Sequence, residues 1–375
     1  MTPLPASFDR EREFPILNSW DFFNHAGVSP ISQRVADALQ KYTHEALHDA
    51  YLTGNWYDQA HDVRKLAARL INAEASEIAF IKNTSEGLAF VANGLDWHAG
   101  DEIVSAQGEF PSNVYPWMDL AQRCGVRHIM VPEKNGRVEQ DDLFNACSPK
   151  TRMIALSHVE FGSGFCNDLA AIGKFCRERR ILLCVDAIQS CGVLPVDVRA
   201  MEIDFLSTSG HKWLMSPEGF GFFFCRKSLI TSLRPEVGGN NVVNPLEYGR
   251  YEFILRSDAR RFECGGPNNA GTLALGAALK LALEVGVETI RARVIELTDH
   301  LCARLEEKGY QVYSSRLPGE KSGIVAFTSP KEEPKAIVNR LMDKKIVTVP
   351  RLGRVRVAPH YYNSIEQIER LIAAL

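Results

Sequence analysis

The sequence predicts an α/β fold in which a mainly parallel, doubly wound sheet forms a large domain and a smaller α+β unit follows it. Three observations predict this arrangement. Short apolar strands alternate with helical runs between residues 78 and 225, which is the pattern of strand-helix-strand units. After Gly265 the alternation stops and two helical runs follow in succession. A chain of 375 residues with 45% hydrophobic content is also long enough to bury more than one core.

The elements of the large domain follow in order. Ser32 to about Tyr51 is predicted as a helix, because its apolar residues recur on one stripe. Ile78–Ile81 is a short strand, and Thr84-Ser-Glu-Gly87 then opens a helical run, Leu88–Gly94, with the hydroxyl residues that helix starts favour. By the same patterns the remaining strands are Glu102–Ser105, Met153–Leu156, Leu182–Val185, Phe205–Ser207 and Gly221–Cys225, and the remaining helices are Val114–Cys124 and Leu169–Arg179.

The smaller unit begins with two helical runs, Ala270–Val285 and Glu288–Lys308. Its other predicted elements are short strands near Gln311–Ser315, Ile324–Phe327 and Val355–Val357, and helices near Pro334–Asp343 and Ser364–Leu375. We therefore predict a large domain of residues 18–262 and a small domain made of residues 1–17 together with residues 263–375.

Composition limits the classes of partner. Lys and Arg number 43 against 46 Asp and Glu, and they form no basic block, so we expect neither a nucleic-acid nor a membrane partner. The nine cysteines are scattered without a C-x-x-C spacing, as is typical of reduced thiols in the cytoplasm. The first residues lack the pattern of a secretory signal, and no apolar run reaches the length of a membrane span. We expect a cytoplasmic protein that acts on a small polar ligand.

Chemically active residues follow the predicted strands, where ligands bind in open α/β sheets. Asp186 ends the apolar run Ile181–Val185, and Lys212 follows the strand Phe205–Ser207, 26 residues further on. One strand-helix-strand step would place the two on neighbouring loops. Taken singly, a turn-capping aspartate and a surface lysine are the more common interpretations.

Two further loops complement this pair. Thr84 and Ser85 stand at a predicted helix start, where hydroxyls, free N–H groups and the helix dipole suit a phosphate, and Ser209 and His211 could add donors. Phe110 follows the strand Glu102–Ser105 and could cover a flat heterocycle. An ordinary helix cap and a core aromatic ring are the alternatives for each feature in isolation.

Together these groups describe a site for pyridoxal 5'-phosphate. Lys212 would hold the aldehyde as a Schiff base. Asp186 would keep the pyridine nitrogen protonated, and Gln189 in Asp186-Ala-Ile-Gln189 could hydrogen-bond the ring hydroxyl.

The same segments resemble the class V aminotransferase group of fold type I pyridoxal-phosphate enzymes, which includes cysteine desulfurases and isopenicillin N epimerase-like proteins. The resemblance covers nearly the whole chain, in the family's order. It rests on Asn83-Thr-Ser-Glu86, Glu109-Phe-Pro-Ser-Asn113, Asp186-Ala-Ile-Gln189, Ser209-Gly-His-Lys212, Phe262-Glu-Cys-Gly-Gly-Pro-Asn268 and Arg356-Val-Ala-Pro-His-Tyr-Tyr-Asn363.

The resemblance implies the fold type I architecture, a homodimer with active sites near the subunit interface, and a role for each matched residue. Lys212 is the catalytic Schiff-base lysine, and the other cofactor-binding residues are Thr84, Ser85, Phe110, Asp186, Gln189, Ser209, His211 and Gly266. Arg356 matches the arginine that binds the substrate carboxylate, with Asn24 and Phe161 assigned to the same substrate site. A strand-edge salt bridge is the alternative role for Arg356.

Departures from the family pattern leave the reaction open. The segment Val347–Arg354, where cysteine desulfurases keep a nucleophilic cysteine, contains none, and Phe110 replaces their usual histidine. Gly266 stands where relatives often use a phosphate-binding threonine from the neighbouring subunit, and Phe161 replaces a polar residue. We expect an aminotransferase acting on a small amino acid. A C–S or other β-elimination lyase, or an amino-acid epimerase, is the alternative.

One motif predicts a different class of enzyme. His44-Glu45-Ala-Leu-His48 matches H-E-x-x-H, the helix signature of zinc hydrolases. At 100° per residue, however, both histidines fall opposite the apolar stripe centred near Val35, and no third histidine follows in the metzincin pattern. We expect a solvated helix face here and no metal.

Overall fold

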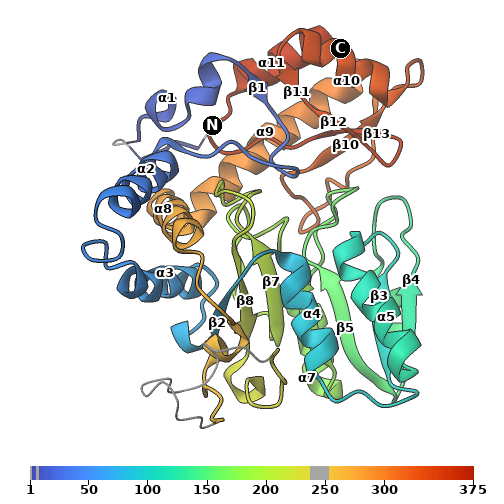
Figure 1. Cartoon of the computed structure of the whole chain (residues 1–375). Coiled ribbons are helices and arrows are strands. Elements are labelled where there is room, and N and C mark those ends of the chain that lie inside the picture. Colours follow the sequence, from blue (N-terminus) through green and yellow to red (C-terminus); the bar gives the residue numbers. More distant parts are fainter. Residues whose placement is uncertain (1, 6–7, 237–252) are drawn as a thin grey trace.

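The computed structural model describes residues 2–5, 8–236 and 253–375, and its centre is a seven-stranded sheet (Figure 1). The strands lie in the order β2-β8-β7-β6-β5-β3-β4. Strand β8 is antiparallel to both neighbours, and the pairs β7–β6, β6–β5, β5–β3 and β3–β4 are parallel. The bounds are β2 Ile78–Ile81, β3 Glu102–Ala106, β4 Arg127–Val131, β5 Thr151–Ser157, β6 Leu182–Asp186, β7 Phe205–Ser209 and β8 Gly221–Cys225. The predicted α/β fold with a mainly parallel sheet is confirmed.

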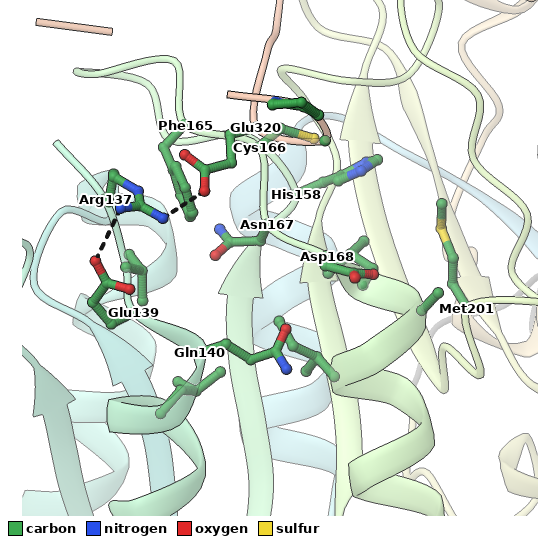
Figure 2. Close-up of a pocket in the computed structure, with 17 residues that line it drawn as sticks. Arg137, Glu139, Gln140, His158, Phe165, Cys166, Asn167, Asp168, Met201 and Glu320 are labelled. Atoms are coloured by element: carbon green, nitrogen blue, oxygen red, sulfur yellow. Dashed lines mark hydrogen bonds and ion pairs between the residues drawn. The ribbon is translucent and has the colours of Figure 1, made fainter. Parts of the chain in front are cut away.

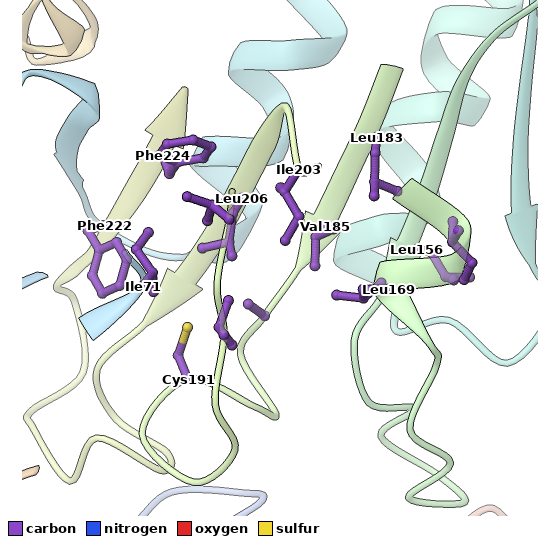
Figure 3. Packing of buried hydrophobic residues seen from close by; sticks show 14 of the residues in the cluster. Ile71, Leu156, Leu169, Leu183, Val185, Cys191, Ile203, Leu206, Phe222 and Phe224 are labelled. Atoms are coloured by element: carbon purple, nitrogen blue, oxygen red, sulfur yellow. The ribbon is translucent and has the colours of Figure 1, made fainter. Parts of the chain in front are cut away.

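Helices bury both faces of this sheet. Ile154 and Leu156 of β5 pack in a cluster with residues of α3, α6, α7 and α8. Figure 3 shows Leu156 with Leu169 of α7 in this cluster. Met153 and Ala155 pack instead with residues of α4 and α5. Because successive side chains point to opposite faces, a strand buried on both faces is apolar throughout, and that explains the continuous apolar runs in the sequence. The helices are α3 Trp56–Leu70, α4 Thr84–Gly94, α5 Tyr115–Cys124, α6 Gln140–Asn145, α7 Leu169–Arg179 and α8 Asn269–Val285.

The C-terminal part forms a second, antiparallel sheet in the order β12-β13-β10-β9, above the large sheet in Figure 1. Its strands are β9 Gln311–Val312, β10 Val325–Thr328, β12 Val349–Arg351 and β13 Arg354–Val357. Phe327, Val355 and Val357 pack with apolar residues of the three helices α9 Val287–Glu307, α10 Pro334–Asp343 and α11 Ile365–Ala374.

The N-terminal segment joins this second sheet region. Strand β1 (Asp21–Phe22) pairs in parallel with β11 (Ile346–Val347), and Asn24 forms a bridge with Ala358. The domain division at residues 18 and 262 stays a prediction, although these contacts attach residues 21–24 to the C-terminal part. The remaining elements are the helices α1 Arg10–Glu13 and α2 Gln33–His48 and the 3-10 helices Pro15–Asn18, Ala75–Glu77, Pro111–Asn113, Lys227–Leu229 and Ala259–Phe262.

Several short elements (α1, α6, β1, β11 and β12) and two longer ones, α3 and β4, have no counterpart among the sequence predictions. Helix α3 begins after Asn55, whose side chain makes no cap and whose φ is 44°, so the usual start signal is missing. Strand β4 lies at the edge of the sheet with most of its residues only partly buried, and it lacks the apolar run of the central strands. In the described ranges no single helix could cross a membrane by length and apolarity, and only α8 and α9 together, bent by 78°, pass that test.

Candidate active site

The predicted Schiff-base lysine and its predicted acidic partner lie at the carboxyl ends of neighbouring central strands. Asp186 is the last residue of β6 and lies beside Ser207 of the parallel neighbour β7. Lys212 follows three residues after β7 ends at Ser209. The structure thus places the carboxylate and the amine on adjacent loops at one edge of the sheet, as the spacing of 26 residues suggests.

Lys212 is partly buried, with Nζ 5.5 Å from the centroid of the Phe110 ring. Burial lowers the pKa of its ammonium to about 8, and the nearby cations Arg356 and Arg351 act in the same direction. The Asp186 carboxylate opposes the shift by favouring the charged ammonium. The neutral amine, which is the form that can attack an aldehyde or accept a proton, therefore becomes the main form of Lys212 above about pH 8.

Asp186 is 2% exposed, and its Oδ1 accepts a hydrogen bond from the backbone N of Ile188 at 3.0 Å. Burial raises the pKa of this carboxyl group to about 6. No ion pair joins it to a cation within the described parts of the chain. A protonated ring nitrogen placed against Asp186 would supply the missing positive charge, so this carboxylate fits the pyridinium partner.

The Gln189 side chain is fixed before any ligand binds. The indole Nε1 of Trp213 donates to Gln189 Oε1 at 2.8 Å, and Gln189 Nε2 donates to the carbonyl of Ala26 at 3.1 Å. An amide NH₂ group has two donors, so Nε2 keeps one hydrogen for a ligand oxygen. This geometry suits the predicted bond to the ring hydroxyl.

A cradle for an anion lies at the start of α4. Thr84 is its first residue, and its buried Oγ1 has no hydrogen-bond partner, which is costly unless a ligand supplies one. Ser85 Oγ donates to Ser112 Oγ at 2.8 Å. Ser209 Oγ lies 2.9 Å from His211 Nδ1, and burial and the charge on Lys212 lower the pKa of that imidazole. The orphaned hydroxyl and the free N–H groups of the first turn fit a phosphate.

Arg356 anchors the predicted substrate side of the site. Its Nη1 donates to the carbonyl of Phe161 at 3.1 Å and its Nη2 to Asn24 Oδ1 at 3.3 Å, while Nε is buried without a partner. The residue is 2% exposed, and burial lowers the pKa of its guanidinium to about 10. The Phe161 ring meets Phe110 edge-on at 5.2 Å. Arg356 therefore contacts both of the other predicted substrate residues, and Phe161 in turn contacts the aromatic ring that faces Lys212.

Gly266 lies elsewhere in this chain. It is exposed and lines a hollow of about 380 Å³ with Lys82, Phe220 and Phe262. A Cβ built on it would contact nothing, so no close approach within this chain requires glycine. Its predicted contact with phosphate stays a prediction that depends on a second subunit.

Comparison with known proteins decides the family. The profile of the family "Aminotransferase class-V" matches residues 22–371. The chain belongs to this family. The class V membership and the matching fold confirm the expected pyridoxal 5'-phosphate-dependent enzyme.

Several relatives of this class V enzyme match over almost their full length. A probable cysteine desulfurase of Pyrococcus abyssi is 29% identical, with 98% of this chain and 96% of the relative covered. An uncharacterized aminotransferase, YcbU of Bacillus subtilis, is 28% identical, with 99% and 97% covered. Among solved structures, the cystine C-S lyase C-DES in complex with its product cysteine persulfide has a TM-score of 0.89 at 26% identity, covering 96% of this chain and 98% of that one.

Two buried glutamates beside the site of this class V enzyme were not predicted. Glu109 accepts hydrogen bonds at 2.5 Å from both the backbone N and the Oγ of Ser157, and burial raises its pKa to about 7. Glu160 is fully buried with Oε2 unpartnered, and burial and Glu109 raise its pKa well above the usual value. Glu109 is adjacent in sequence to Phe110, and Glu160 is adjacent to Phe161. This adjacency to predicted site residues is the one feature of the sequence that could have pointed to the two glutamates.

A separate pocket of about 520 Å³ at the start of α7 contains none of the predicted site residues (Figure 2). Arg137 pairs there with Glu320 at 2.5 Å. Burial raises the pKa of Cys166 to about 12 and lowers the pKa of His158 to about 4, so the pocket offers neither a ready thiolate nor a charged imidazole. We therefore place the chemistry at the Lys212 edge of the sheet.

The H-E-x-x-H motif lies on α2 with a structural contact of its own. His44 and His48 are exposed, and their rings meet at 4.5 Å. Glu45 Oε2 accepts a hydrogen bond from Trp56 Nε1 at 2.8 Å, which ties α2 to α3. No group of three potential metal ligands is found in the described ranges, and we propose no metal site here.

Proposed function

We propose that this class V enzyme is an aminotransferase that transfers the amino group of a small amino acid to a 2-oxo acid. The observation that carries the proposal is the pair formed by Lys212 and Arg356 beside a loop without a thiol. The hairpin that presents Arg356 contains arginines and no cysteine, and the last cysteine of the chain, Cys302, is buried in the C-terminal core. A sulfur acceptor of the desulfurase kind is therefore missing from the part of the chain that faces the amine.

We assign substrate binding to Arg356 and proton transfer to Lys212. Pyridoxal phosphate, when bound, supplies an electron sink for the charge that develops at the substrate α-carbon. Arg356 orients the substrate α-carboxylate through its guanidinium, which Phe161 and Asn24 hold in place. Lys212 Nζ, neutral above its pKa of about 8, would take the α-proton and then release it at a different carbon from the one it came from, as transfer of the amino group requires.

A second candidate, a C–S lyase, is favoured by the likeness to the cystine C-S lyase and by the relatives named as cysteine desulfurases. The same Lys212 base would serve it, because loss of the α-proton precedes expulsion of a sulfur group from the β-carbon. The absence of a thiol from the hairpin is compatible with elimination, which needs no sulfur acceptor on the protein.

The test is a panel of amino acids offered to the holoenzyme with 2-oxo acid acceptors. An aminotransferase consumes one amino acid and one 2-oxo acid and forms the complementary pair in equal amounts, and Lys212→Ala abolishes this exchange. Release of pyruvate and sulfide or persulfide from cysteine or cystine, without any need for an acceptor, would favour the lyase instead. Activity that survives in Lys212→Ala would contradict both.

A further inference from the structure

The hairpin formed by β12 and β13 presents three arginines on one face. In this antiparallel pair Val349 lies opposite Arg356, and Arg351 lies opposite Arg354. Residues directly opposite, and residues two apart along a strand, point to the same side of a sheet. Arg351, Arg354 and Arg356 therefore share the face that meets Lys212, while Val355 points into the C-terminal core.

The turn of this hairpin is fixed against the wall of the active site. Leu352 and Gly353 form a two-residue turn with φ values of 48° and 73°, both in the left-handed region. The Leu352 side chain lies directly over Gly162, because a Cβ on that glycine would come within 2.7 Å of Leu352 Cδ1. Gly162 follows Phe161, whose carbonyl binds Arg356, so Arg351 is held next to the substrate side of the site.

The three guanidinium groups differ in what they contact. Arg354 stacks over the Tyr313 ring, with Cζ 3.3 Å from the ring centroid. Arg356 binds Phe161 and Asn24. Arg351 is exposed and makes no hydrogen bond or ion pair with any described residue. No described carboxylate forms an ion pair with any of the three.

Two of these cations act on the reacting amine. The charge on Arg351 lowers the pKa of both Lys212 and Arg356. Like charges held close together without an acid to balance them are unfavourable, and the cost disappears when anions bind. One carboxylate satisfies Arg356, whose buried Nε lacks a partner. Arg351 then remains as an exposed cation without an ion pair to any described residue, on the same face of the hairpin as Arg356.

We propose that the substrate carries a second anionic group, and that Arg351 binds it: the preferred substrate is an amino acid whose side chain ends in a carboxylate. The inference rests on the proposed function, because it takes Arg356 as the partner of the α-carboxylate. Arg351 is thus the residue that selects among amino acids, whereas Arg356 accepts the group that all of them share.

The test uses calorimetric binding of unreactive acids to the holoenzyme. Glutarate and pentanoate have the same number of carbon atoms and differ in one carboxylate. We expect glutarate to bind roughly 10- to 100-fold more tightly, as one charge-assisted bidentate pair contributes. Arg351→Gln should abolish this preference, because it removes the proposed partner of the second carboxylate. Arg354→Gln is the matched control, since it removes the same charge from the same face and should keep the preference.

The outcomes separate this inference from the proposed function. Equal binding of the two acids by the wild-type enzyme, or an undiminished preference in Arg351→Gln, would overturn the role of Arg351. Loss of the preference in Arg354→Gln to the same extent would also overturn it, because a diffuse charge effect would then explain the result. If Arg356→Gln fails to weaken pentanoate binding, the assignment of Arg356, and with it the proposed function, is wrong.

Discussion

The amine of Lys212 lies in surroundings that lower its pKa. It is partly buried among an acid, Asp186, and two cations, Arg351 and Arg356, and its pKa is lowered to about 8. A lowered pKa means that the neutral amine, the reactive form, gains population as the pH rises through about 8.

The rate at which cofactor-free enzyme captures pyridoxal phosphate should therefore rise between about pH 7 and pH 9 and then level off. Arg351→Gln should move the midpoint to higher pH, because the cation it removes lowers the pKa of Lys212. Asp186→Asn should move it to lower pH for the opposite reason. The measurement is the first-order rate of the change in cofactor absorbance at each pH. A midpoint near the ordinary lysine value of about 10.4 would contradict this account.

The sequence predicts which individual residues come together when they follow strands that are neighbours in the sheet. Asp186 and Lys212 could be paired because one strand-helix-strand step separates them, and the structure has their strands side by side. The burial of Glu160 and the position of Arg351 could not be predicted in this way. Glu160 lies beside Glu109, which follows another strand, and the hairpin that carries Arg351 is held by the bond from Arg356 to the carbonyl of Phe161, 195 residues away. No local pattern records how these segments meet.

At the scale of elements, helix α7 packs so closely against a neighbouring loop that position 173 has no room for a side chain. A Cβ on Gly173 would lie 2.0 Å from the backbone carbonyl oxygen of Met201. Helix propensity alone predicts that Gly173→Ala stabilises the fold by up to about 1 kcal/mol. The clash with backbone opposes this, since overpacking costs about 1–3 kcal/mol and a backbone oxygen cannot turn aside.

We expect Gly173→Ala to lower the free energy of unfolding by about 1–3 kcal/mol despite its better propensity. Lys174→Ala, at an exposed position of the same helix, should change it by less than about 0.5 kcal/mol. Urea unfolding of the two variants measures both values. A Gly173→Ala protein as stable as the wild type would show that α7 and the loop do not approach so closely.

Element prediction succeeded where burial on both faces produced continuous apolar strands, as in β6 and β8. It failed for α3, which has no capping side chain, and for β4, which is an edge strand. Both elements pack against other parts of the chain: α3 against α8, which comes much later in the sequence, and β4 against β3, the preceding strand. Local propensity is a weak guide to such elements.

At the scale of the whole molecule, the resemblance to class V enzymes predicts a homodimer. The hollow that contains Gly266 is lined by the aromatic residues Tyr57, Phe80 and Phe262 together with charged side chains such as Lys82 and Arg260, and Tyr57 is 63% exposed. An exposed aromatic side chain at such a position is a candidate contact for a second subunit. Light scattering during size exclusion should give twice the monomer mass of 41.9 kDa, and Tyr57→Asp should shift the equilibrium toward monomer. A monodisperse monomer at micromolar concentration would contradict the dimer and leave Gly266 without its predicted role.

Lys212 is the residue on which every other assignment depends, because we expect it to capture the cofactor beside Asp186. Borohydride reduction of the holoenzyme, followed by digestion and mass spectrometry of the peptides, identifies that lysine directly. We expect one equivalent of reduced cofactor on Lys212 and none on the Lys212→Ala protein, with visible absorption lost on reduction. A modified lysine elsewhere in the chain, or a protein that takes up no cofactor at all, would contradict the assignment of the site.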